Sequence, residues 1–127
     1  MVYMIELNAY EQTLLDGWED VYRKSQLTLW LLLALREGEK HMAEIKLFIA
    51  EATNKLLSPD DKSMYRTLRR LTAAEIIIFS ERAATGGPDY KIYKLTTVGQ
   101  RLLSTFVQRN IIDIYYDQHL QSIIKKG

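Results

Sequence analysis

The sequence contains no cysteine among its 127 residues, and it has only two prolines and six glycines. The missing cysteines exclude a disulfide framework and thiolate metal sites. The longest apolar run, Leu29–Leu35, is seven residues long, whereas a membrane-spanning helix needs about 20. The first residues also lack the basic start and the apolar core of a signal peptide. We therefore expect one globular, helix-rich protein in the cytoplasm, without a membrane partner.

Charge is nearly balanced overall but is unevenly spread along the chain. The formal net charge is +1 at pH 7, which argues against a non-specific polycation. Residues 1–24 carry five acidic and two basic side chains, whereas residues 60–94 carry seven basic and five acidic ones. A local positive field of this kind can guide a polyanion to one surface.

The segment Pro59–Ala74 divides into an apolar side and a basic side at the period of an α-helix, about 100° per residue. Its apolar stripe consists of Met64, Leu68 and Leu71, and its basic side consists of Lys62, Arg66, Arg69 and Arg70. Ser58 is expected to cap this helix, with Pro59 in the first turn. The pattern predicts a recognition helix, and the alternative is a basic face that only keeps the helix soluble.

Two helices are expected near the N-terminus. Asn8 and Glu11 form a capping-box pattern, and apolar residues then recur at intervals of three and four through Ala9–Lys24. Ser25 is expected to cap a second helix, Gln26–Arg36, which ends at Gly38. This second helix is apolar nearly all round, so it should be the central buried element.

A third helix and a β-hairpin complete the central part of the chain. The third helix should end near Asn54, and its apolar face consists of Met42, Ile45, Ile49 and Ala52. After the basic helix, two β-rich runs, Ile76–Phe79 and Tyr90–Leu95, flank the turn-rich sequence AATGGPD. This order predicts a mainly α fold with a small β-hairpin, a winged helix-turn-helix. Residues 1–25 add an N-terminal helix, residues 26–96 form the DNA-binding domain, and residues 97–127 form a long C-terminal dimerisation helix.

Three segments combine into a more specific pattern. They are HMAEIK (His41–Lys46), SMYRTLRRLTAAEII (Ser63–Ile77) and GGPDYKIYKLTTVGQ (Gly86–Gln100). The most specific positions are Tyr65, Leu68, Arg70, Leu71, Gly86, Gly87, Lys91, Tyr93, Leu95, Thr96 and Gly99. Together these segments resemble the PadR family of transcriptional regulators over about residues 26–103. The resemblance implies a winged-helix, DNA-binding regulator.

The sequence departs from the family pattern at several positions. Arg66 stands where the family often has proline, Glu75 where a glycine usually precedes the first wing strand, and Tyr90 where an arginine is common. Met42 and Ala43 replace the usual glycine and tyrosine after the histidine. These departures concern the choice of DNA sequence rather than the fold.

The recognition helix and the wing supply the expected DNA contacts. An α-helix fits the major groove, where side chains of its N-terminal half usually reach bases. The residues expected to do so are Lys62, Ser63, Arg66 and Thr67. Those expected to contact phosphates, which supply affinity without sequence information, are Arg69, Arg70, Lys91 and Lys94. The aromatic residues Tyr65, Tyr90 and Tyr93 are instead expected to pack between helix and hairpin.

A last helix, capped by Thr96, is expected from Thr97 to Ile124. Its broad apolar band extends past the winged-helix core, so a second copy of the chain should cover it. The residues expected at this dimer contact are Trp18, Phe106, Ile111, Ile114 and Tyr115. The alternative is that the helix folds back onto its own subunit.

Catalysis has no support in the sequence. His41 and His119 are isolated, and no HExxH, GxGxxG or GxxxxGK[ST] motif occurs. A structural role for each histidine is favoured over metal ligation. We therefore expect no catalytic residue, no metal site and no cofactor.

The function expected from these features is sequence-specific DNA binding by a homodimer that represses transcription. Its recognition helix would enter the major groove of double-stranded DNA, and its wing would contact the backbone. The alternative is a winged-helix protein-interaction module that does not bind specific DNA. A small aromatic effector is a further expected partner, with Trp18 and Trp30 as its candidate pocket, although Trp30 also suits plain core.

Overall fold

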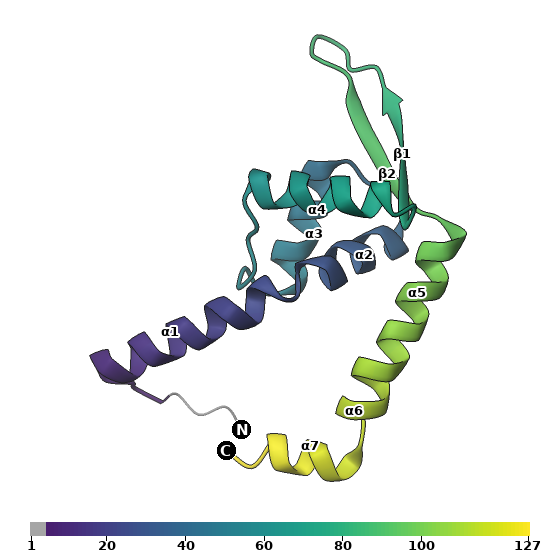
Figure 1. Cartoon of the computed structure of the whole chain (residues 1–127). Helices are drawn as coiled ribbons and strands as arrows, with labels where there is room; N and C mark the ends of the chain where they lie inside the picture. The colour runs from purple at the N-terminus through teal and green to yellow at the C-terminus, as the bar shows by residue number, and fades with distance from the viewer. Residues whose placement is uncertain (1–4) are drawn as a thin grey trace.

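The computed structural model describes residues 5–127, so the first four residues of the predicted N-terminal segment lie outside the described part. The elements are α1 (Ala9–Lys24), α2 (Leu27–Glu37), α3 (Met42–Ala52), α4 (Asp61–Ala73), β1 (Ile77–Arg82), β2 (Tyr90–Leu95), α5 (Thr97–Val107), η1 (Gln108–Ile112), α6 (Asp113–Tyr115) and α7 (Gln118–Ile124). Figure 1 shows α2, α3, α4 and the hairpin grouped together, with α1 projecting to one side and α5 leading away on the other. The predicted mainly α fold with a small β-hairpin is confirmed.

The core is built around α2, as its apolar sequence predicts. Leu31 and Ala34 are fully buried, and α2 contacts α3, β2 and α5. The fully buried large side chains are Leu31, Ile45, Ile49, Met64, Leu68, Ile77 and Leu103. Each such side chain contributes about 1.5–3 kcal/mol to folding before entropy is subtracted. Within residues 5–127, every helix is too short or too polar to cross a membrane.

The hairpin is antiparallel, and its register runs from Ile77 opposite Leu95 to Arg82 opposite Tyr90. The first strand therefore begins one residue later than predicted and extends three residues further, to Arg82. An additional pairing joins the hairpin to the helical part of the fold. The backbone N–H of Lys40 donates to the Tyr93 carbonyl at 3.0 Å, and the Tyr93 N–H donates back at 2.8 Å.

The helix starts follow the predicted chemistry in α1, but two of the predicted caps, Ser25 and Ser58, do not form. The Asn8–Glu11 capping box is present, and α1 has the predicted bounds. Ser25, however, lies at the end of α1, where its hydroxyl donates to the Tyr22 carbonyl at 2.7 Å. Helix α2 begins at Leu27 without a side-chain cap, so the prediction that Ser25 caps it is wrong.

Asp60, not Ser58, caps α4, the helix predicted to contact DNA. Its carboxylate accepts a hydrogen bond from the Ser63 backbone N–H at 2.7 Å. This hydrogen bond holds the pKa of Asp60 below its ordinary value, and the positive charges of Arg66 and Lys62 act in the same direction. The helix therefore begins at Asp61, two residues after the proline.

Glu75 occupies the position where the resembled family has glycine, and its backbone explains that preference. Its φ of +60° lies in the left-handed region, which glycine enters most easily. The conformation aims the Glu75 carbonyl at the hydroxyl of Thr96, which donates to it at 2.7 Å. Thr96 also caps α5 by accepting from the Gly99 N–H, so this threonine ties the start of the wing to the helix that follows it.

The C-terminal helix is interrupted, which corrects the prediction of one helix running to Ile124. The chain continues from α5 through the π-helical turn η1 into α6, and it then leaves helical geometry at Asp117, whose ψ is 129°. The Asp117 carboxylate accepts from the Leu120 N–H at 2.8 Å. Because a capping aspartate adopts extended backbone, the chain turns there and α7 runs in a new direction (Figure 1).

Candidate nucleic-acid interface

Helix α4 presents a basic ridge over a buried apolar face. Lys62, Arg66 and Arg69 are exposed, whereas Met64 and Leu68 on the opposite side are buried. The three basic residues lie within about 60° of one another around the helix axis, given about 100° per residue. The ridge therefore points a narrow line of positive charge away from the core.

Thr67 does not belong to this ridge, and its burial argues against the predicted contact with bases. Only 8% of the residue is exposed. At about 100° per residue, Thr67 lies about 60° from Met64 but about 100° from Arg66, which places it at the edge of the apolar face. Ser63 is half-buried, and its backbone N–H is already used by the Asp60 cap.

Arg70 turns toward α2 instead of pointing along the ridge. Its Nη2 atom donates to the Thr28 hydroxyl at 2.7 Å. Since a guanidinium has five N–H donors, this bond leaves other donors for a phosphate. The structure thus places Arg70 on the flank of the predicted interface, near the start of α2.

The two predicted wing contacts, Lys91 and Lys94, lie on opposite faces of the hairpin. Side chains alternate along a strand, and Lys91 shares its face with the buried residues Tyr93 and Leu95. The Lys91 Nζ atom lies 4.3 Å from the centre of the Phe79 ring. Lys91 is therefore near α4, whereas Lys94 points to the other side of the wing.

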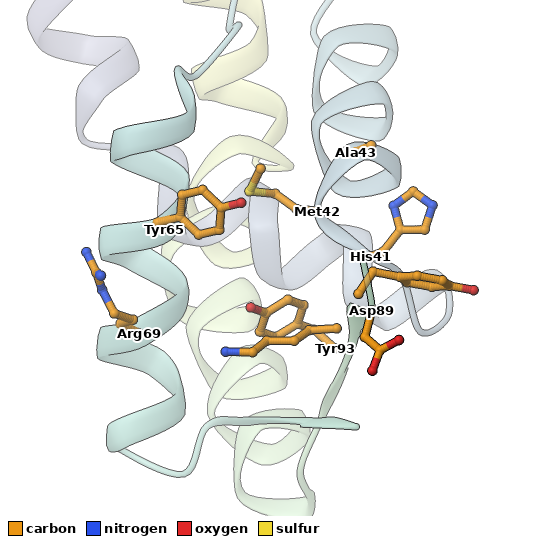
Figure 2. Close-up of a pocket in the computed structure, with 9 residues that line it drawn as sticks. His41, Met42, Ala43, Tyr65, Arg69, Asp89 and Tyr93 are labelled. Atoms are coloured by element: carbon orange, nitrogen blue, oxygen red, sulfur yellow. The ribbon is translucent and has the colours of Figure 1, made fainter. Parts of the chain in front are cut away.

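A cleft separates α4 from the start of α3 and from the wing (Figure 2). Its volume is about 750 Å³. The residues that line it are His41, Met42, Ala43, Tyr65, Arg69, Asp89, Tyr90, Lys91 and Tyr93. In Figure 2, Tyr65 projects from α4 toward Met42, and Asp89 lies on the opposite side beneath His41. The cleft thus continues the basic ridge toward the wing.

The three tyrosines of the cleft differ in exposure. Tyr93 is 6% exposed, and burial raises the pKa of its phenol, with nearby Tyr65 adding to the shift. Tyr65 and Tyr90 are 49% and 41% exposed. The prediction of packing between helix and hairpin is therefore confirmed for Tyr93, whereas Tyr65 and Tyr90 also offer surface to the cleft. The sequence carried a signal for the exposure of Tyr65. This residue lies at the edge of the apolar stripe, one turn before Arg69.

His41 has a structural role in the described chain, as predicted. It caps α3 by accepting the Glu44 backbone N–H at its Nδ1 atom, and the Glu44 carboxylate accepts the His41 N–H in return. Its ring also meets Tyr90 edge to face, with centroids 5.6 Å apart. Throughout residues 5–127, no cluster of three or more potential metal-ligating side chains occurs.

Two apolar surfaces remain uncovered in the single chain. Helix α1 has no buried residue, and Trp18 is 74% exposed. Of the predicted dimer contacts on the C-terminal helices, Ile111 is half-buried and Phe106, Ile114 and Tyr115 are exposed. In this chain, folding back does not cover them. Trp30, in contrast, is half-buried and packs against the core, away from the exposed stripe of α1.

Comparison with known proteins identifies the fold. The structure of a PadR-like transcription factor from Bacteroides fragilis is 25% identical with a TM-score of 0.61, over 72% of this chain and 86% of that one. PadR of Bacillus subtilis, solved in complex with operator DNA, is 26% identical with a TM-score of 0.60, over 65% of this chain and 46% of that one. A PadR family regulator from Eggerthella lenta shares the fold, with 16% identity and a TM-score of 0.71, over 94% of this chain and all of that one. No curated protein matches.

A sequence model of the transcriptional regulator PadR-like family matches residues 31–105. This match includes α3, the basic helix α4, the hairpin and most of α5, so it spans every element that lines the cleft. It also covers more than half of the 127 residues. The chain therefore belongs to the PadR-like family of transcriptional regulators.

Proposed function

We propose that this protein is a homodimeric repressor that binds specific double-stranded DNA and blocks transcription. The observation that carries the proposal is the ridge of Lys62, Arg66 and Arg69 on a capped helix whose other side is buried. A rigid helix of this kind fits the major groove, where arginine can bridge the two acceptors of guanine. The B. subtilis relative in complex with operator DNA supports this assignment.

The basic residues of the ridge would contact different parts of the DNA according to their position along α4. Lys62 and Arg66 lie in the N-terminal half of α4, which usually meets base edges. Arg69 lies one turn further and borders the cleft, where a phosphate is the natural partner. Phosphate contacts give affinity and salt dependence to binding, while base contacts give it specificity.

Arg66→Ala is expected to weaken operator binding by about 1–3 kcal/mol, because a good bidentate contact to guanine discriminates by that amount. Binding to DNA of unrelated sequence should change less. Mobility shifts with a pseudo-palindromic promoter fragment and a scrambled fragment, each over a salt series, measure both effects.

Arg101→Ala is the matched control, since Arg101 is an exposed arginine on α5, away from the ridge. It should leave both affinities close to those of the wild type. Unchanged operator affinity in Arg66→Ala would show that Arg66 does not contact a base. A wild-type protein whose weak DNA binding lacks salt dependence and sequence preference would favour the alternative, a protein-interaction module.

We propose that α1 and the C-terminal helices form the dimer interface. In this proposal, residues 26–96 bind DNA, and the flanking residues 1–25 and 97–127 form the dimer contact. The exposed apolar residues of α1 are Tyr10, Leu14, Trp18, Val21 and Tyr22. In water such a stripe favours a partner surface, and a two-fold dimer would place two recognition helices on successive turns of DNA.

We also propose that a planar aromatic effector binds near Trp18. Trp18 lies with Leu15, Glu19 and Tyr22 around a shallow depression of about 190 Å³, which the dimer partner would enclose. A ligand in the seam can release DNA only if it prefers the conformation that does not bind DNA. The proposed pocket leaves out Trp30, which packs against the core.

Two single-tryptophan variants should separate the candidate residues. In Trp30→Phe, which keeps only Trp18, an added planar aromatic compound is expected to quench fluorescence and weaken operator binding. In Trp18→Phe, which keeps only Trp30, quenching should be lost. Quenching that persists in Trp18→Phe would place the pocket elsewhere.

A further inference from the structure

The cleft between α4 and the wing carries charge of both signs. Arg69 borders it from α4 and Lys91 from β2, so cations stand on two of its sides. The carboxylate of Asp89 lines the same cleft, and among residues 5–127 it has no ion-pair partner within 4.0 Å. An unpaired negative charge in the same cleft as two cations lowers the positive potential of that cleft.

The cleft, with a volume of about 750 Å³, has room for an anionic group. The half-exposed Tyr65 offers a phenolic O–H, which can donate a hydrogen bond to a phosphate oxygen. Tyr90 and His41, in edge-to-face contact, form the opposite wall. Tyr90 is uncharged, although an arginine is common at this position in the resembled family. The cleft therefore combines the Tyr65 hydroxyl and two cations with one carboxylate that opposes them.

We propose that this cleft seats a backbone phosphate of bound DNA, and that Asp89 restrains the affinity by repelling it. The proposal rests on the DNA-binding function proposed above and adds a residue that limits binding. Arg69 and Lys91 attract the phosphate from two sides, and Tyr65 donates to it. Asp89 weakens the same contact. Tyr90 is uncharged, so it does not add the positive charge that an arginine would bring.

The test uses the full-length protein and a fluorescein-labelled duplex of arbitrary sequence, titrated over a salt series. A unit charge a few ångströms from a phosphate in a water-like dielectric changes affinity by about threefold per chain. Asp89→Asn is therefore expected to tighten binding about threefold per chain at low salt, with the gain vanishing as salt rises. Tyr65→Phe should weaken binding without changing the salt dependence, because it removes a donor but no charge.

Tyr90→Arg is expected to steepen the dependence of log K on log salt by about 0.9 for each added phosphate contact. Glu51→Gln is the matched control, since it makes the same charge change on the exposed surface of α3, outside the cleft. Asp89→Asn that binds no more tightly than Glu51→Gln, together with an unchanged slope in Tyr90→Arg, would overturn the phosphate site. A wild-type protein that fails to bind any duplex would instead overturn the DNA-binding function itself.

Discussion

Gly99→Ala is expected to lower the free energy of unfolding by about 2–4 kcal/mol, the range of a severe overpacking change. Gly99 is buried in the first turn of α5, and a methyl group there would overlap the backbone carbonyl oxygen of Ile76. That carbonyl is held in place, because it accepts a hydrogen bond from the Thr96 backbone N–H at 3.1 Å. Relief therefore requires α5 to shift against β1. Urea denaturation at fixed protein concentration measures the loss.

Gly87→Ala provides the matched control for this substitution. Gly87 lies exposed in the wing loop, and an added Cβ would meet no atom within 4 Å. Its stability should stay within about 0.5 kcal/mol of the wild type. If Gly99→Ala were equally mild, the close approach of α5 to the start of the wing would be wrong.

Trp18→Lys is expected to convert the proposed dimer into monomers. Burying a large apolar side chain contributes about 1.5–3 kcal/mol, and a two-fold interface contains the residue twice. The dissociation constant of the dimer should therefore rise by a factor on the order of 10³. Operator affinity should fall with it, since one recognition helix loses its linked neighbour. Sedimentation equilibrium and mobility shifts measure the two effects.

The substitution separates assembly from folding, because Trp18 is 74% exposed in the single chain. The winged-helix core should keep its circular dichroism spectrum. Gln12→Lys is the control, since Gln12 is exposed on the polar side of the same helix, about 150° from the centre of the apolar stripe. It should remain a dimer. A Trp18→Lys protein that also remains a dimer would move the interface away from α1.

Features that depend on neighbours a few residues apart were predictable. The Asn8–Glu11 box and the apolar spacing after it gave the bounds of α1, because a cap and its partner lie within one helical turn. The turn residues between Ile77 and Leu95 likewise predicted a hairpin. The resemblance to the PadR family added the DNA-binding role, which periodicity alone left open between DNA and protein partners.

Exact helix boundaries were harder to predict, because several nearby residues could each cap the helix. Ser58 and Asp60 are both good capping residues, and the structure uses Asp60. Similarly, the apolar band of the C-terminal segment fits one long helix, yet the Asp117 carboxylate caps a new one. Capping preferences overlap among residue types, so the sequence limits the helix boundary to a few positions without fixing it.

The sequence by itself determined the first four helices, the hairpin, their order and the basic side of α4, since each depends on spacing along the chain. Only the tertiary structure decided how the predicted DNA contacts divide. Thr67 is buried, and Arg70 bonds Thr28, which is 42 residues away in the chain. The cleft joins α3, α4 and the wing, and it brings Asp89 to the same surface as Arg69. Such groupings arise when the apolar faces of separate elements pack into one core. Helical or strand periodicity describes each element alone, so it cannot predict which charged residues of different elements become neighbours.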